Sequence, residues 1–226
     1  MQTDQGHRLY ADLNHSPITS ATKIKIIETG IELFSQKGYS GVSVRDITKE
    51  VGIKESSLYK HFKSKEELIE TIFFNFRRAC GEILPPMDSL DTIISGMDVH
   101  VFLEKGWDNF KRHIDDPIHQ KIWQMMYLEL FRHPRAMEIY RVEIIEKTLD
   151  CLELVFAKMA EAGKIKPIKH FRVLAVEYQY PLFMMVMDYH LLKSQNESTD
   201  KVEQQVADHI DFFVEMTGMQ RGGVVD

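Results

Sequence analysis

The sequence is poor in cysteine, and its two cysteines stand far apart. Cys80 and Cys151 are all that a chain of 226 residues contains, and they form no CxxC pair. A disulfide framework needs more cysteines at closer spacing and belongs to an oxidising compartment. We therefore expect a protein of the reducing cytoplasm, in which both cysteines are small buried side chains rather than nucleophiles or redox sensors.

The sequence also lacks a secretion signal and a membrane-spanning run. Its first 15 residues, MQTDQGHRLYADLNH, contain no apolar core, and residues 1–18 are expected to form a flexible tail. The most apolar later stretch, residues 173–192, is interrupted by Glu177, Pro181 and Asp188. This composition favours a buried helix over a membrane span, so no membrane partner is expected.

Motifs of catalysis and cofactor binding are missing as well. The chain contains no GxSxG, no GxGxxG and no phosphate-binding P-loop. Histidines and aspartates gather between residues 100 and 133. Their densest segment, HIDDPIH, is broken by Pro117 and lacks the i, i+4 spacing of zinc-binding helices. We predict no catalytic residue, no metal, no cofactor and no enzyme activity, whereas a metal held by these histidines would favour a small helical enzyme.

The charge of the chain is acidic overall but unevenly distributed. A net charge of −6 argues against a protein that coats nucleic acid without sequence preference, because such binding depends mostly on neutralising phosphates. Residues 1–80 nevertheless hold 12 Lys and Arg against 10 Asp and Glu, whereas the remainder holds 16 against 24. Residues 45–65 hold six basic and three acidic side chains. This distribution indicates one end that faces nucleic acid and another end with a different task.

The hydrophobic pattern predicts an all-α protein, since no stretch shows the period-two alternation of a strand. About nine helices are expected, at residues 20–37, 44–50, 54–62, 64–83, 90–113, 118–132, 134–162, 168–194 and 199–217. We expect an N-terminal three-helix helix-turn-helix DNA-binding domain at residues 19–66. A larger C-terminal helical bundle is expected at residues 67–218.

The segment around Gly52 has the pattern of a helix-turn-helix. Ser43 and Asp46 form a capping-box pattern at the start of a short helix, and Gly52 separates that helix from the next one. In such a unit the second helix enters the major groove of DNA. The outer face then carries Lys54, Glu55, Ser56, Ser57, Tyr59 and Lys60. These residue types suit phosphates and base edges, although composition alone fits a solvated charged face equally well.

Residues 43–70, SVRDITKEVGIKESSLYKHFKSKEELIE, resemble the DNA-binding domain of TetR-family transcriptional regulators. The shared elements are the capped short helix, the glycine turn, the Leu-Tyr-x-His-Phe sequence at residues 58–62 and the Ser-Lys-Glu-x-Leu start at residues 64–68. The resemblance extends over about residues 22–71, and Phe34 and Gly38-Tyr39 end the first helix in the manner of the family.

The resemblance implies a set of DNA contacts. Residues that match phosphate-holding positions of the family are Ser57, Tyr59, His61 and Lys65, and Arg45 matches a position that touches backbone or base. The start of the recognition helix sets sequence preference and holds Lys54, Glu55 and Ser56, the last of which departs from the glycine or alanine of many members. The full candidate set is Ser43, Arg45, Lys54, Glu55, Ser56, Ser57, Tyr59, Lys60, His61 and Lys65.

The resemblance also implies that residues 67–218 are a ligand-binding and dimerisation domain. It assigns the interface of the homodimer to the last two long helices. The stretch FRVLAVEYQYPLFMMVMDYHLL is apolar over more than one face, which exceeds the need of a helix that covers only its own domain. A second stripe comprises Val206, Ile210, Phe213 and Val214. Simple burial within the monomer is the alternative explanation for both patterns.

A small-molecule site is expected inside the C-terminal bundle. Its candidate residues are aromatic or adaptable side chains between residues 97 and 131 with few charges among them: Met97, His100, Trp107, Phe110, Trp123, Met126, Tyr127 and Phe131. An apolar or aromatic effector is expected, and ordinary core packing is the alternative for each residue.

The family resemblance, together with these patterns, implies a ligand-responsive repressor that binds a palindromic double-stranded DNA operator as a homodimer and is released by a small-molecule effector. The helix at residues 64–83 is expected to connect the two domains and to transmit the effect of the ligand. The alternative is a helical ligand-binding or interaction protein that retains the domain without binding an operator.

Overall fold

The structure is a computed structural model, and it describes residues 10–166 and 168–218. Within these residues the secondary structure is helical, and the extended pairing that it contains is an isolated bridge between Ala11 and Pro17. The prediction of an all-α fold is therefore confirmed. The described chain divides into two compact units, one of residues 10–81 and 115–140 and one of residues 82–114 and 141–218.

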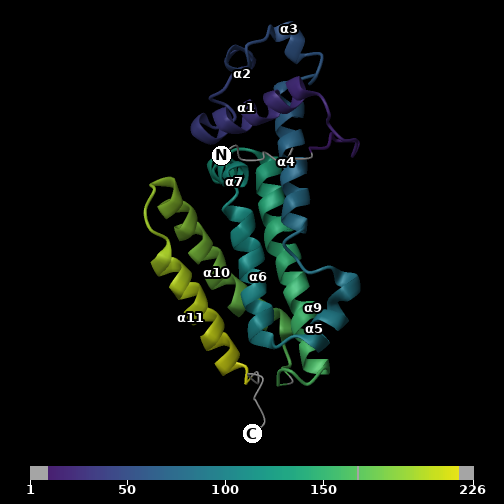
Figure 1. Cartoon of the computed structure of the whole chain (residues 1–226), viewed down its shortest axis with the longest axis vertical. Helices are drawn as coiled ribbons and strands as arrows, with labels where there is room; N and C mark the ends of the chain where they lie inside the picture. The colour runs from purple at the N-terminus through teal and green to yellow at the C-terminus, as the bar shows by residue number, and fades with distance from the viewer. Residues whose placement is uncertain (1–9, 167, 219–226) are drawn as a thin grey trace, which may run out of the picture. The chain divides into compact units, whose positions relative to one another are not determined.

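The first unit contains the N-terminal helices together with a later helical segment. Its helices are α1 (Ala21–Lys37), α2 (Val44–Val51), α3 (Glu55–Leu58), α4 (Lys65–Gly81), α7 (Pro117–Glu129) and α8 (Pro134–Glu138). Helix α1 begins where the Ser20 hydroxyl accepts a hydrogen bond from the Lys23 N–H, and it runs across α4 (Figure 1). One face of α1 is buried, and it includes Ile27, Ile31 and Phe34.

Residues 10–18 of the expected tail lie against α4. Tyr10, Ala11 and Ile18 are buried, and the Asn75 side chain bonds both the N–H and the carbonyl of Ala11 at 2.8 Å. The remaining part of the expected tail, residues 1–9, lies outside the described residues.

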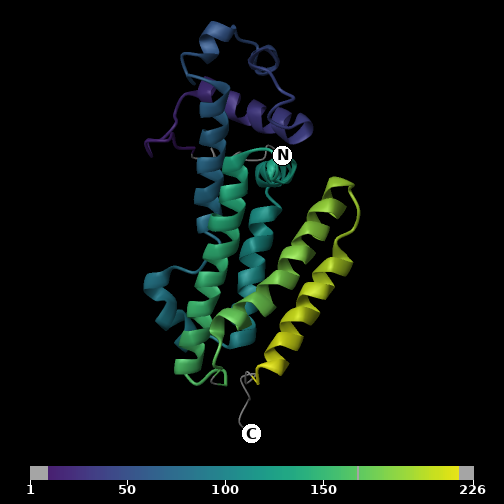
Figure 2. The same ribbon diagram turned by 180° about the vertical axis from the view of Figure 1, so that it is seen from behind.

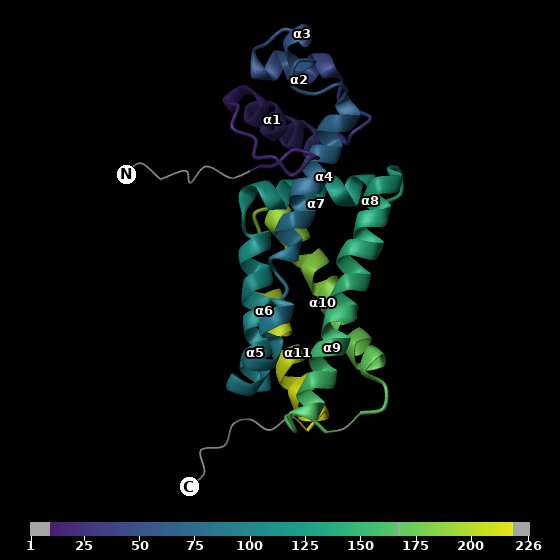
Figure 3. The same cartoon turned by 90° about the vertical axis from the view of Figure 1, so that its right-hand side faces the viewer.

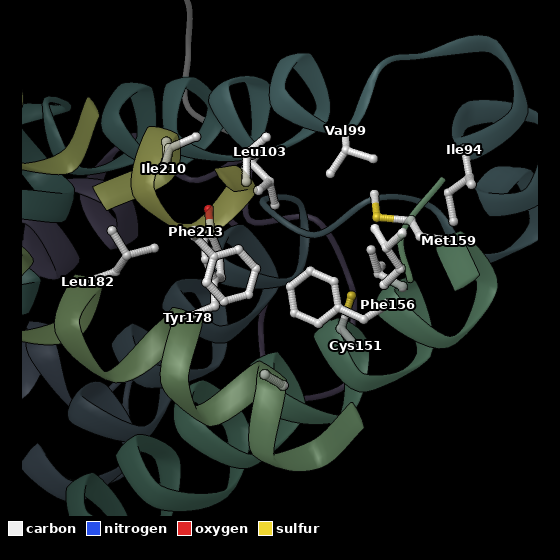
Figure 4. Close-up of a cluster of buried hydrophobic side chains, with 14 of the residues drawn as sticks. Ile94, Val99, Leu103, Cys151, Phe156, Met159, Tyr178, Leu182, Ile210 and Phe213 are labelled. Atoms are coloured by element: carbon white, nitrogen blue, oxygen red, sulfur yellow. The ribbon is translucent and has the colours of Figure 1, made fainter. Parts of the chain in front are cut away.

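The second unit is a helical bundle with one continuous apolar core. Its helices are α5 (Leu90–Gly96), α6 (Val99–Ile114), α9 (Lys147–Glu161), α10 (Phe171–Ser194) and α11 (Asp200–Met216). Helix α6 packs against α11, and α9 packs against α10 (Figures 2 and 3). In the core the rings of Phe156, Tyr178 and Phe213 face one another with centroids 4.8–6.0 Å apart (Figure 4).

Two of the expected long helices are divided in the structure. The segment expected at residues 90–113 is interrupted after Gly96, because Met97 adopts an extended conformation and α6 starts anew at Val99. The segment expected at residues 134–162 comprises α8, a wider π-helical stretch (Ile139–Glu146) and α9. The predicted recognition helix at residues 54–62 is shorter as well, since α3 ends at Leu58 and continues as hydrogen-bonded turns.

Candidate DNA-binding interface

Helix α2 begins with a complete capping box. The Ser43 hydroxyl accepts from the Asp46 N–H at 3.2 Å, and the Asp46 carboxylate accepts from the Ser43 N–H at 2.8 Å and from its hydroxyl at 2.6 Å. These hydrogen bonds hold the pKa of Asp46 below its ordinary value. The capping pattern expected from the sequence is therefore present, and it fixes where α2 starts.

The turn between α2 and α3 depends on Gly52. This residue has a left-handed backbone with φ 80°, a conformation that glycine adopts without steric cost. Its N–H and the N–H of Ile53 both donate to the Thr48 carbonyl, at 3.0 and 2.9 Å. The turn therefore closes α2 and directs the chain into α3.

The interior of the helix-turn-helix is aliphatic and aromatic, as the sequence predicts. Ile47, Val51, Leu58 and Phe62 are buried. On the opposite side α2 and α3 present polar side chains. The exposed members are Ser43, Arg45, Lys54, Glu55, Ser56, Tyr59 and Lys60, and the half-buried ones are Ser57 and His61. All ten candidate DNA-binding residues, with half-buried Lys65 included, thus occupy exposed or half-buried positions of residues 43–65.

Arg45 and Glu55 form an ion pair between α2 and α3. The Arg45 Nε lies 3.2 Å from the Glu55 Oε1, and 84% of the Arg45 side chain is exposed. An exposed pair of this kind contributes only about 0–1 kcal/mol to stability. The ion pair instead places the Arg45 and Glu55 side chains next to each other on the same face of the helix-turn-helix.

Lys65 is placed differently from the other candidates. Its ammonium donates to the carbonyls of Tyr39 and Val42 at 2.8 and 2.7 Å, and it lies 4.0 Å from the centre of the Tyr39 ring. Burial lowers the pKa of Lys65, and the charges of Glu66 and Glu129 act in the opposite direction. Since an ammonium has three donors, two of them are committed to holding the connection between α1 and α2.

Two further side chains support the helix-turn-helix and were not found from the sequence. The Lys25 ammonium donates to the Val51 carbonyl at 3.0 Å, so it ties the end of α2 to α1. The Glu129 carboxylate accepts from the Tyr39 N–H at 2.8 Å. These pairs are separated by 26 and 90 positions in the chain, and no local sequence pattern connects them.

The eight candidate ligand residues divide equally between the two units. In the second unit, His100 lies 2.8 Å from Asp211, and Trp107 is in ring contact with Phe110 and Tyr189. In the first unit, Trp123 is in ring contact with Tyr127 at 5.8 Å.

The candidates also differ in exposure. Trp123 and Met126 are buried, Met97 is half-buried, and Phe131 is 89% exposed. Burial raises the pKa of Tyr127 above its ordinary value. The candidates in the first unit therefore range from fully buried positions to one of the most accessible aromatic rings.

Helices α10 and α11 expose apolar side chains. Val173, Tyr180, Met184 and Leu191 are 49–64% exposed, and their spacing places them on one stripe of α10 at 3.6 residues per turn. On α11 the stripe expected at the interface is instead buried in the core of the second unit, as the alternative of burial within the monomer has it: Val206, Ile210, Phe213 and Val214. One turn of α11 exposes Phe212 and Met216. We refer to the six exposed residues as the α10–α11 apolar face.

The residues that the structure describes contain neither a membrane-spanning helix nor a cluster of metal ligands. None of the described helices combines the length and the apolar character that crossing a membrane requires. In the part of the chain that the structure describes, no three His, Cys, Asp or Glu side chains gather closely enough to hold a metal ion.

Comparison with known proteins identifies the helix-turn-helix. The family model of bacterial regulatory proteins of the tetR family matches residues 26–72. The biofilm operon icaADBC HTH-type negative transcriptional regulator IcaR of Staphylococcus aureus strain Newman is 54% identical over 186 residues, which cover 80% of this chain and 89% of IcaR. The chain belongs to the TetR family.

Solved TetR-family structures share the fold. A TetR transcriptional regulator from Chloroflexus aurantiacus superimposes with a TM-score of 0.62 at 20% identity, covering 87% of this chain and 95% of that one. A transcriptional regulator from Aquifex aeolicus gives 0.59 at 21% identity, covering 85% and 99%. The resemblance to the TetR family stated from the sequence is confirmed, and the chain is a TetR-family transcriptional regulator rather than an enzyme.

Proposed function

We propose that this TetR-family regulator is a repressor that binds a palindromic operator as a homodimer and leaves it when a small molecule binds the C-terminal bundle. The observation that carries the proposal is the exposed polar face of α2 and α3 over a fully buried interior. A regulator that acts on the chromosome works in the bacterial cytoplasm, and we propose that location.

The proposed contacts divide into two kinds. Ser57, Tyr59 and Lys60 are assigned to phosphates, and they lie at and just beyond the C-terminal end of α3 on either side of buried Leu58. Glu55 and Arg45 are assigned to base edges, where glutamate can accept from a cytosine amino group and arginine can donate to guanine. Ser43, Lys54, Ser56 and His61 complete the surface.

Lys65 is still proposed to contact a phosphate, but with only one of its three N–H donors. Two of its N–H donors hold the carbonyls of Tyr39 and Val42, so one donor remains for a phosphate. Its larger contribution is to keep the α1–α2 connection in place beneath the DNA-binding face. For this reason we base the salt-dependence test on Lys60, whose side chain is exposed.

The α10–α11 apolar face is proposed as the dimer interface. Exposed apolar area of this kind favours association with another protein surface. Two copies related by a twofold axis would each offer the same stripe, as an isologous interface requires. A dimer in turn presents two helix-turn-helix units to two half-sites about one turn of DNA apart, or a multiple of a turn.

The effector and the direction of regulation are the remaining parts of the proposal. The effector is proposed to be apolar or aromatic and to contact some of the eight candidate ligand residues, with α4 transmitting its effect to α1–α3. Repression is supported by IcaR, whose name describes a negative transcriptional regulator. The ligand needs only to bind one conformation of the dimer more tightly than the other.

The DNA-binding part is tested by fluorescence anisotropy with labelled duplexes over a range of salt concentrations. We expect binding that weakens with salt, and we expect Lys60→Ala to reduce the slope of log K against log salt by about 0.9. Lys105→Ala, an exposed lysine of α6, serves as the control with an unchanged slope. Equal salt slopes for wild type and Lys60→Ala would count against the assigned face.

The effector part is tested by thermal shift against a library of small apolar and aromatic metabolites. A ligand that binds the folded state raises the melting temperature, and it must also lower the affinity for DNA because the coupling is reciprocal. A compound that stabilises the protein without changing DNA affinity would contradict its role as effector.

A further inference from the structure

The connection between α1 and α2, residues 38–42, is a short segment with no helix of its own. It leaves α1 at Gly38, whose φ is 71°, and enters α2 at Ser43. The connection therefore acts together with the direct packing of α2 on α1 in placing α2 and the following α3. A change in the conformation of residues 38–42 would therefore shift α2 and α3, which carry the proposed DNA-binding residues.

Lys65 holds this connection from the side of α4. Its ammonium bonds the carbonyls of Tyr39 and Val42 at 2.8 and 2.7 Å, which are the second and the last residues of the connection. Its charge also lies over the Tyr39 ring. Two of the five carbonyls of the segment are thus satisfied by one side chain of α4.

Glu129 holds the same connection from α7. Its Oε1 accepts from the Tyr39 N–H at 2.8 Å, and only 2% of the residue is exposed. A Cβ atom added to Gly38 would meet this oxygen at 2.8 Å, so glycine is required there both for its φ and for the close approach of the carboxylate. A buried carboxylate is costly unless it is hydrogen-bonded, and this one meets a backbone N–H of the connection.

The end of α7 makes a second contact with the same residue. His133 lies just beyond α7, and its ring meets the Tyr39 ring edge-on at 5.4 Å. The Tyr39 hydroxyl donates to Glu66 at 2.6 Å, and His133 Nε2 lies 3.3 Å from the other oxygen of Glu66. Tyr39 is therefore enclosed by α4 and by the α7–α8 turn through both its backbone and its ring.

We propose that Glu129 is a positioning residue for operator binding, which holds the α1–α2 connection in the conformation that presents α2 and α3 to DNA. This inference rests on the proposed DNA-binding function and adds to it a residue far outside the helix-turn-helix. It makes α7 a second element, besides α4, through which the rest of the chain can change DNA affinity. Glu129 itself touches no DNA.

The test is the replacement Glu129→Met, which keeps the side-chain length and removes the acceptor for the Tyr39 N–H. The apparent Kd rises in inverse proportion to the fraction of molecules that hold the competent conformation. We expect it to rise about tenfold for operator and non-operator duplexes alike. The salt slope should be unchanged because every phosphate contact is kept. Amide hydrogen exchange at residues 38–42 should accelerate in the free protein.

Glu129→Gln and Gln124→Met are the matched controls. The glutamine keeps a carbonyl acceptor at the same place, so its affinity should return to within about twofold of wild type. Gln124 is exposed on the same helix, and its replacement by methionine should change neither affinity nor exchange. All affinities refer to the concentration of folded protein measured by circular dichroism, so that simple destabilisation does not imitate the effect.

Several outcomes would overturn the inference. A folded Glu129→Met variant with wild-type affinity would do so. A salt slope lowered by about one would do so too, because it would mean that one cationic side chain has lost its phosphate contact while the rest of the face still binds. If Glu129→Met does not fold, Glu129→Asp withdraws the acceptor by one methylene and should weaken binding about threefold; wild-type affinity and exchange in that variant overturn the inference equally. Absence of DNA binding by the wild-type protein would contradict the proposed function itself, which separates the two failures.

Discussion

The two proposed interaction surfaces of the molecule differ in what they leave exposed to water. Around α2 and α3 the apolar side chains are inside, and the exposed ones are charged or hydroxyl-bearing, with Arg45 and Tyr59 as examples. On α10 and α11 apolar side chains are found inside and outside, and Met184 is 64% exposed. A surface that meets phosphates needs donors that remain solvated when it is free, whereas a surface that meets another protein gains from apolar area that it removes from water.

Each surface should therefore respond to a different kind of substitution. Removing one donor from α2 or α3 should weaken DNA binding by the energy of that single interaction and leave the rest of the face working. A charge placed on the α10–α11 apolar face should instead prevent association outright, because an unpaired charge is costly to bury. Substitutions on both surfaces can separate the two responses.

Met184→Glu should have the largest effect. Burying an unpaired carboxylate in an apolar interface costs several kcal/mol, so the dimer dissociation constant should rise at least about a hundredfold. Sedimentation velocity should show a monomer, and operator binding should fall with it. Val101→Glu, a matched change on an exposed apolar residue of α6, should remain dimeric. A Met184→Glu protein that sediments as the wild type does would remove this face from the interface.

Glu55→Ala should change which sequence is preferred. Replacing a side chain that reads a base edge alters discrimination at that base pair by about 1–3 kcal/mol. Fold stability should hardly change, because its ion pair with Arg45 is exposed. Competition binding with single-base-pair variants of the operator measures the effect, and Glu50→Ala on α2 is the control. An unaltered preference at every position would show that Glu55 reads no base.

Tyr59→Ala should weaken binding to all duplexes to a similar extent. The side chain is half exposed at the end of α3 and is assigned to the DNA backbone, so its removal should cost about tenfold in affinity, or ~1.4 kcal/mol, without regard to sequence. Anisotropy titrations with the operator and with a scrambled duplex measure both affinities. A weakening confined to the operator would make Tyr59 a base contact instead.

Ser43→Ala should have the smallest effect, through the stability of α2. Removing a serine N-cap costs about 1 kcal/mol, measured by urea unfolding at pH 7. The bonds that Ser43 donates to the Asp46 carboxylate depress the folded-state pKa of Asp46. The part of the stability that comes from these bonds is therefore present above the unfolded pKa of about 4 and is lost as pH falls through the folded pKa. The difference in the free energy of unfolding between wild type and Ser43→Ala should therefore become smaller in acid. A difference that does not change with pH would contradict the capping-box explanation.

Much of the helix-turn-helix was predictable because its determinants are local. Ser43 and Asp46 are three positions apart, and the turn at Gly52 follows from a single glycine in an otherwise helical pattern. Burial of Ile47, Leu58 and Phe62 follows from the helix-turn-helix pattern and from the resemblance to the TetR family. The residues that make up each of these local patterns lie within about ten to fifteen positions of one another.

The side chains that hold the helix-turn-helix in place, Lys65 and Glu129, were not predictable in these roles because their partners are distant in the sequence. The sequence predicts Lys65 as a phosphate contact, whereas the structure turns its ammonium onto two carbonyls 23 and 26 positions away. Glu129 carries no signal at all, since its partner lies 90 positions earlier in the chain. The break after Gly96 likewise escaped prediction, because glycine inside a helical pattern is tolerated in many helices.

Selection of binding sites by the wild-type protein from a pool of random duplexes tests most directly whether a dimer reads DNA through α2 and α3. We predict that one inverted repeat is enriched, with half-sites about one turn of DNA or a multiple of it apart from centre to centre, and that Tyr59→Ala enriches the same repeat more weakly. Enrichment of a single asymmetric half-site would contradict the proposed dimer. No enrichment by the wild-type protein above that of Tyr59→Ala would contradict the assignment of α2 and α3 as the DNA-binding face.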